Sequence, residues 1–189
     1  VYKRQELVHR AGDFMDVGIL GARTIFHVLA KHSEWDLAYK MITRPESPSY
    51  GNQVLRGRTA LPENFNNENG PIFSLNHHFF GDVSAWFMKR VAGIIVNPNL
   101  SSPAEINVQP AFITSLDSAK ASLETIKGCI KVEWSRNPDE IELKIDVPEG
   151  VFGKIVLPDE FSFISNDEIQ NNKKVLPLDS GVYTVSNVM

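Results

Sequence analysis

Cysteine is nearly absent from this chain, and long apolar runs are absent too. The 189 residues contain one cysteine, Cys129, so no disulfide can form within the chain, and we expect no redox role for it. It stands at the head of an alternating apolar run, where a small buried hydrophobic residue fits. No apolar stretch reaches the roughly 18 residues that a membrane-spanning helix needs, and no signal peptide opens the sequence.

An excess of positive charge is also lacking. The sequence has 19 lysines and arginines against 23 aspartates and glutamates, a net charge of −4, and the basic residues are scattered singly or in short pairs. Nucleic acids and anionic membranes attract clustered basic residues, so we expect neither as a partner. What is present is 42% apolar and 10% aromatic residues, which is enough to bury one or two ordinary cores.

The first five residues, VYKRQ, lack an initiator methionine and resemble the translated end of a sequencing-library adapter. We interpret residues 1–5 as a non-native scar that takes no part in the native fold; the alternative is an exposed basic end of a strand or helix. With a scar at the front, the sequence is expected to be the tail of a longer protein, and its localisation and oligomeric state stay open.

Residues 6–97 carry helical periodicity. VGILGARTIFHVL, at residues 17–29, is apolar on nearly every face. Such a helix is normally buried on both sides, so without its partners it should expose apolar surface. Ser33 and Asp36 in SEWD match a variant of the capping box, which predicts a second helix from Ser33. The short link predicts a helical hairpin.

Two aspartates near the sequence GDFMD, Asp13 and Asp16, are expected to lie at a helix start, where carboxylates interact favourably with the helix dipole. Residues 44–73 are rich in proline and glycine and show no sustained period, which predicts a long loop. Long loops inside compact domains tend to be functional.

After this loop, Ser74 is a good N-cap, and apolar residues then recur at spacings of three and four as far as Ile94. The pattern predicts one helix with Asn76, His77 and His78 in its first turn, where unpaired backbone N–H groups suit oxygen-rich or anionic ligands. The alternative is that one histidine caps or packs and the other is solvated. Adjacent histidines point about 100° apart on a helix, and no further ligand stands at suitable spacing, so we expect no metal and no cofactor.

After Pro98 the hydrophobic period changes to two. In CIKVEWSR and IELKIDV the apolar side chains alternate with polar ones, and NPDE between them makes a turn, which predicts a β-hairpin with one wet face. Further short runs bring the expected number of strands to six or seven, and a small antiparallel β-sandwich is the natural packing. The aromatic residues of this region could line a sugar-binding face, but core positions are the more usual place for them; they are Trp134, Phe152, Phe161 and Phe163.

Several blocks in one unbroken order resemble the C-terminal end of the bacterial α-L-rhamnosidases, glycoside hydrolase family seventy-eight. The blocks are DVGILGARTIFHVL, WDLAYKMI, SPSYG, GRTALPENF, SLNHHFFGDVSAWFMKRVAGI and SAKASLETIKGCIKVEWSRNPDEIELKIDVPEGVFGKIVLP. The resemblance implies an α then β, multidomain arrangement. Residues 6–97 would be the C-terminal part of an (α/α)6 barrel, and residues 98–189 a small antiparallel β-sandwich domain.

The resemblance also implies an activity. The family cleaves terminal rhamnose with inversion, using a carboxylic acid to protonate the leaving oxygen and a carboxylate to activate water. The family's general base lies in a loop motif like Thr-Thr-x-Trp-Glu, which aligns with residues 59–63, so Glu63 is the candidate general base. Judged without the family, Glu63 would be an ordinary solvated acid. His77 matches the position whose imidazole hydrogen-bonds the sugar, and Asn76 and His78 are candidate substrate-binding neighbours.

Two features depart from the family pattern. Pro62 replaces the tryptophan that usually precedes the catalytic glutamate, which removes a surface on which a sugar ring can stack and leaves the linkage and aglycone open. The general acid belongs to a motif that residues 6–36 do not reproduce, so this chain alone should be inactive. The expected partner is a rhamnose-containing glycoside or polysaccharide. Two alternatives remain: a non-catalytic carbohydrate-binding or structural module, and another (α/α)6-barrel polysaccharide hydrolase or lyase.

Overall fold

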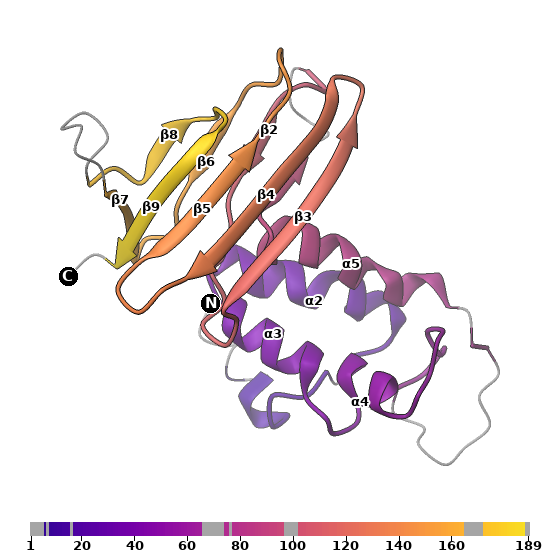
Figure 1. The fold of residues 1–189 in the computed structure, drawn as a ribbon. Helices are drawn as coiled ribbons and strands as arrows, with labels where there is room; N and C mark the ends of the chain where they lie inside the picture. The colour runs from indigo at the N-terminus through magenta and orange to yellow at the C-terminus, as the bar shows by residue number, and fades with distance from the viewer. Residues whose placement is uncertain are drawn as a thin grey trace. The chain divides into compact units, whose positions relative to one another are not determined.

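The protein is described by a computed structural model that covers residues 6, 8–15, 17–65, 74–75, 77–96, 102–164 and 172–187. The chain forms two compact units, Val1–Trp86 and Phe87–Met189. The described elements of the first unit are helical, and the strands all belong to the second (Figure 1). This order confirms the predicted α then β fold. No helix among these residues is long and apolar enough to cross a membrane.

The first unit contains the predicted helical hairpin, formed by α2 (Ile19–Lys31) and α3 (Trp35–Thr43). The facing sides of the two helices are buried, with Ala22, Phe26, Leu29 and Ala30 on α2 and Trp35, Ala38, Met41 and Ile42 on α3. The apolar sequence of α2 is covered on one side only, since Leu20 is 73% exposed. The exposed apolar surface expected for this helix is therefore present.

The capping box predicted at Ser33 is wrong. Ser33 has a φ of +61° and ends α2 instead of starting α3: the N–H groups of His32 and Glu34 both donate to the carbonyl oxygen of Leu29. The N-cap residue of α3 is Glu34, which makes no side-chain capping hydrogen bond. A serine held in the left-handed turn of one helix end cannot at the same time cap the next helix.

The segment predicted as one long loop contains a short helix, α4 (Tyr50–Leu55). Ser49 is its N-cap, and the Ser49 hydroxyl accepts a hydrogen bond from the Asn52 N–H at 2.9 Å. Gly51 lies so close to the end of α3 that a Cβ atom there would be 2.3 Å from the Thr43 carbonyl oxygen. The sequence gives no sign of α4, because a helix of six residues is too short to show a helical period.

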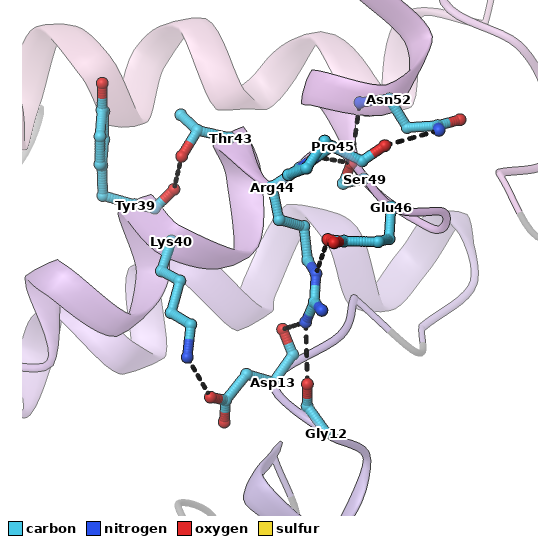
Figure 2. A network of polar contacts seen from close by, with 10 residues as sticks. All are labelled: Gly12, Asp13, Tyr39, Lys40, Thr43, Arg44, Pro45, Glu46, Ser49 and Asn52. Atoms are coloured by element: carbon cyan, nitrogen blue, oxygen red, sulfur yellow. Dashed lines mark hydrogen bonds and ion pairs between the residues drawn. The ribbon is translucent and has the colours of Figure 1, made fainter.

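A polar network joins the end of α3 to the turn that contains Asp13 (Figure 2). The Arg44 guanidinium donates to the carbonyl oxygens of Gly12 and Asp13 at 2.8 and 3.0 Å, and it lies over the Phe14 ring at 3.5 Å. The Lys40 ammonium donates to the Asp13 carboxylate at 2.7 Å. Asp13 has a φ of +59° and sits in a turn before α2, so its predicted place at a helix start is wrong; Asp16 lies outside the described residues.

The Asp13 carboxylate should give the first unit a measurable pH dependence. Its hydrogen bond from Lys40 lowers the pKa below the ordinary value of 3.8, with a further contribution from His9 and an opposing one from burial. A lowered folded-state pKa stabilises the fold above the ordinary pKa, and this stabilisation is lost as pH falls through the lowered value. We expect Asp13→Asn to reduce the free energy of unfolding by about 0.5–1 kcal/mol at pH 6, because Lys40 is mostly exposed.

The measurement is urea unfolding of wild type and Asp13→Asn between pH 6 and pH 2.5. The difference in the free energy of unfolding between the two proteins should disappear at the acidic end of this range. A difference that stays constant with pH would show that the carboxylate charge contributes nothing.

The second unit is a β-sandwich of two sheets (Figure 1). The four-stranded sheet has the order β1 (Ile94–Val96), β2 (Ile106–Val108), β6 (Lys154–Val156), β8 (Val175–Pro177). The five-stranded sheet has the order β3 (Ser118–Thr125), β4 (Gly128–Arg136), β5 (Ile141–Asp146), β9 (Gly181–Asn187), β7 (Phe161–Ile164). Pairing among these strands is antiparallel apart from β2 with β6, which is parallel.

The predicted hairpin is formed by β4 and β5, with Trp134 paired to Leu143 and Val132 to Ile145. Their apolar side chains are buried and the alternating polar ones are exposed, as the period of two requires. One core cluster includes residues of both sheets, among them Ile106 and Ile155 from the smaller sheet. The predicted antiparallel sandwich is therefore confirmed, with the parallel pair of β2 and β6 as its one departure among the described strands.

Two features of the sandwich differ from expectation. Eight strands, not six or seven, are described after Pro98, since β7 and β8 had not been predicted. The first three residues of β7 are all buried, so this strand has no alternation to detect. Cys129 is half-buried and not a core residue, and a hydrogen bond with Glu124, aided by burial, raises the pKa of its thiol.

Most of the four aromatic residues singled out in the sandwich are core residues and do not form a sugar-binding face. Trp134 is fully buried, and its indole N–H donates to the Val91 carbonyl oxygen at 2.8 Å. Phe161 and Phe163 are 6% and 2% exposed. Phe152 differs, being 50% exposed. Three of the four aromatics are thus core residues and are not available to a sugar.

Candidate active site

Two segments that are separate in sequence lie side by side in the first unit, and they carry Glu63 and His77. The Glu63 N–H donates to the Ser74 carbonyl oxygen at 2.9 Å, and the His77 N–H donates to the Leu61 carbonyl oxygen at 3.0 Å. The same two stretches approach again at Gly81, where a Cβ atom would lie 3.9 Å from Leu61. Backbone pairing therefore holds the two principal candidate residues in neighbouring segments.

Glu63 is exposed, and the nearest buried residues on either side of it are Pro62 and Phe65. Within the described part of the chain the Glu63 carboxylate has no hydrogen bond and no ion pair. The buried neighbours hold the loop, because a proline ring and a phenyl ring both remove apolar area from water. The result is a solvated carboxylate on an anchored backbone, which can accept a proton from water.

His77 does not lie inside a helix, so the predicted helix start at Ser74 is wrong. The helical segment begins four residues later with the 3₁₀ turn η1 (His78–Gly81), and continues through α5 (Asp82–Trp86). His77 is the N-cap residue of η1 with extended backbone angles of −102° and 96°. Its N–H is already committed to Leu61, and an N-cap residue with that pairing cannot be in a helical turn.

The predicted helix also ends earlier than expected. After α5 the chain forms a π-helical turn, η2 (Phe87–Val91), and Ile94 begins strand β1. Ile94 fits the helical stripe by spacing alone. Its burial in the core of the sandwich decides its place in a strand, so tertiary packing overrides the local pattern here.

The two histidines are in different environments. His77 is half-buried, and its Nδ1 atom is buried without a hydrogen-bond partner among the described residues. His78 is exposed, and its ring lies nearly parallel to that of His77 with centroids 6.1 Å apart. Asn76, the third candidate of this block, lies outside the described residues. A buried polar atom is normally hydrogen-bonded, so His77 Nδ1 calls for a partner that the described residues do not supply.

Three side-chain hydrogen bonds anchor the segment that follows His77. The Tyr50 hydroxyl donates to the Phe80 carbonyl oxygen at 2.9 Å, and the Trp86 indole N–H donates to the Phe26 carbonyl oxygen at 3.1 Å. His27 Nε2 and Asp82 Oδ2 are 2.6 Å apart. These anchors leave no local signal in the sequence, because each joins residues at least 30 positions apart.

Among the residues whose structure is described, no group of three or more histidine, cysteine, aspartate or glutamate side chains could hold a metal ion. The groups that the described site does present are a solvated carboxylate and a half-buried imidazole, carried on paired segments.

Comparison with known proteins agrees with this division into a helical part and a sandwich. Residues 2–91 match the family model of the bacterial alpha-L-rhamnosidase 6 hairpin glycosidase domain. Residues 104–171 match that of the bacterial alpha-L-rhamnosidase C-terminal domain. The chain belongs to the bacterial α-L-rhamnosidase family.

Curated members of the rhamnosidase family align with most of this chain. An alpha-L-rhamnosidase of Formosa agariphila is 30% identical over 175 residues, which is 89% of this chain and 18% of that protein. An alpha-L-rhamnosidase of an Alteromonas species is 27% identical over 188 residues, 94% of this chain and 20% of that protein. The chain therefore spans about a fifth of the length of these rhamnosidases.

Solved rhamnosidase structures share the fold. The alpha-L-rhamnosidase from Dictyoglumus thermophilum has a TM-score of 0.79 and 28% identity, with 97% of this chain and 22% of that one covered. The Streptomyces avermitilis alpha-L-rhamnosidase, solved with L-rhamnose, has a TM-score of 0.78 and 20% identity, with 95% and 19% covered. At that identity the second comparison supports the fold alone.

Proposed function

We propose that the protein carrying this chain is an inverting α-L-rhamnosidase, and that Glu63 is its general base. The observation that carries the proposal is the backbone pairing of the Glu63 and His77 segments, which brings an exposed carboxylate and a half-buried imidazole into neighbouring segments. A base that activates water and a donor or acceptor that holds a sugar hydroxyl are the two groups that this half of a glycosidase site needs.

In this mechanism Glu63 accepts a proton from a water molecule as the water oxygen attacks the anomeric carbon of the rhamnosyl group. The bond from that carbon to the glycosidic oxygen breaks, and a carboxylic acid on the opposite face protonates the leaving oxygen. Inversion requires the two carboxyl groups to be about 6.5–9.5 Å apart, so that water fits between the base and the sugar. We assign the acid to residues outside this chain, so that the chain alone is inactive.

Substrate binding is assigned to His77 with Asn76 and His78. The half-buried imidazole of His77 hydrogen-bonds a sugar hydroxyl in this proposal, and the exposed ring of His78 extends the polar surface beside it. We propose a terminal α-L-rhamnoside as substrate. Pro62 makes no aromatic surface, so in this site the sugar is held mainly by hydrogen bonds rather than by stacking on residue 62.

The same proposal assigns residues 6–97 to the catalytic barrel and residues 98–189 to the C-terminal sandwich domain, with residues 1–5 as a scar. On this assignment the site residues all belong to the barrel part.

The stereochemistry of the first product tests the proposal. The full-length protein is expected to hydrolyse 4-nitrophenyl α-L-rhamnopyranoside, and proton NMR of the early reaction should show the β-anomer of L-rhamnose before mutarotation mixes the anomers. The 189-residue chain alone should release no nitrophenol. An α-anomer formed first would exclude an inverting mechanism, and no turnover by the full-length protein would favour a non-catalytic module.

A further inference from the structure

A cluster of three aromatic rings lies behind the candidate site and touches both of its segments. Phe65 is two residues after Glu63, and Phe80 is three residues after His77. Their ring centroids are 4.4 Å apart. Tyr50, at the start of α4, packs edge-on against both, with centroids 4.9 Å from Phe65 and 6.4 Å from Phe80. Tyr50 is thus in contact with the segment of the base and with that of the sugar-binding histidine.

The Tyr50 hydroxyl adds a directional contact to this packing. It donates to the Phe80 carbonyl oxygen at 2.9 Å, in a buried position, and the residue is 8% exposed. Burial, together with the nearby charge of Asp82, raises the pKa of Tyr50 well above its ordinary value. The hydroxyl therefore keeps its proton at any working pH and is a permanent donor.

Tyr50 is itself held in place from the other side. Ser49 caps α4 by accepting from the Asn52 N–H, and the Ser49 hydroxyl donates to the Arg44 carbonyl oxygen at 2.6 Å. A separate contact holds the loop of the base: the Ser47 hydroxyl donates to the Phe65 carbonyl oxygen at 2.8 Å. The segment 47–50 therefore anchors the backbone at Phe65 through Ser47 and the backbone at Phe80 through Tyr50.

We propose that Tyr50 is a positioning residue for catalysis. Its hydroxyl bonds the Phe80 carbonyl oxygen and its ring packs on Phe65, and together these contacts fix the position of Glu63 relative to the sugar held by His77. This inference rests on the proposed function. Tyr50 does not touch the reacting atoms; it acts by holding the segment of His77 in a fixed position relative to the segment of Glu63. A base transfers its proton efficiently only when it is correctly oriented toward the attacking water, and an error of about 1 Å can cost two orders of magnitude in rate. The effect should appear mainly in kcat, because the base acts in the transition state.

The test is Tyr50→Phe in the full-length protein, which removes the hydroxyl and keeps the ring. We expect kcat for 4-nitrophenyl α-L-rhamnopyranoside to fall about tenfold. The dissociation constant of L-rhamnose should stay within about twofold of wild type. The matched control is Tyr183→Phe in the sandwich, which removes the same kind of bond, from a tyrosine hydroxyl to the Asp179 carbonyl oxygen at 3.0 Å, and should leave kcat unchanged.

A double substitution separates positioning of the base from general damage. Glu63→Gly removes the base, and azide, which needs no deprotonation, should restore turnover with formation of the β-rhamnosyl azide. In that background Tyr50→Phe should change the azide-dependent rate by less than about twofold, because no carboxylate remains to be positioned. A tenfold loss that persists in the azide reaction would overturn the inference, as would a wild-type kcat for Tyr50→Phe.

Failure of the inference is distinguishable from failure of the proposed function. If Glu63→Gly retains wild-type turnover, the assignment of the base fails. If Glu63→Gly is inactive and rescued by azide while Tyr50→Phe is unaffected, only the inference about Tyr50 fails. Should Tyr50→Phe not fold, Ser47→Ala carries the same test from the other anchor, with the same tenfold fall in kcat and the same insensitivity of the azide reaction.

Discussion

Glutamine in place of Glu63 is expected to lower kcat on an aryl α-L-rhamnoside about 10³-fold in the full-length protein. The amide has nearly the shape of the carboxylate but cannot accept a proton from water, and a positioned general base contributes about 10²–10⁴-fold to such reactions. The affinity for L-rhamnose, measured by calorimetry, should change little. Glu63 is exposed and its carboxylate has no protein partner among the described residues, so the substitution removes no structural contact there.

Glu46→Gln is the matched control for this experiment. Glu46 is another exposed glutamate of the same unit, and its carboxylate contacts Arg44 and not the site segments. It should keep the wild-type kcat. Wild-type turnover by the Glu63→Gln protein would remove Glu63 from the mechanism, and a fall in kcat accompanied by loss of cooperative unfolding would point to a structural role instead.

Alanine in place of His77 is expected to weaken sugar binding. Loss of the hydrogen bond between the imidazole and a sugar hydroxyl leaves a buried polar group of the sugar unpaired, which costs about 1–3 kcal/mol. That corresponds to about a 5- to 150-fold rise in the dissociation constant of L-rhamnose. We expect kcat/KM to fall by a similar factor. Calorimetry of L-rhamnose binding and steady-state kinetics together measure the effect.

His32→Ala provides the comparison for His77. His32 lies in the turn between α2 and α3, where its backbone N–H caps the end of α2, and it is assigned no contact with substrate. Its replacement should leave the affinity for L-rhamnose unchanged. Wild-type affinity of the His77→Ala protein would contradict the role given to the imidazole.

The sandwich could be predicted closely because its signal is local. In β4 and β5 the residue type predicts which face of the sheet each side chain occupies, because apolar and polar residues alternate and a strand directs successive side chains to opposite sides. Strand β7 escaped prediction for the converse reason: Phe161, Ser162 and Phe163 are all buried, and a continuous buried run carries no period.

The helical part was harder, because some of its residues fit more than one local pattern. Ser33 has the residue type and spacing of an N-cap, and Ser74 likewise, yet Ser33 ends α2 and Ser74 pairs with Glu63. The α2–α3 hairpin was predicted correctly because a short link lets two helices fold back and bury their apolar faces against each other.

By itself the sequence determined the α then β order, the alternating faces of the central strands, and the family resemblance that points to Glu63 and His77. Only the tertiary structure decided that the Leu61–Glu63 and Ser74–His77 segments pair, and that Tyr50 bonds to Phe80 from 30 residues away. Local propensity governs neighbours along the chain, whereas contacts between distant segments depend on how all the buried surfaces pack together, and no short pattern encodes that packing.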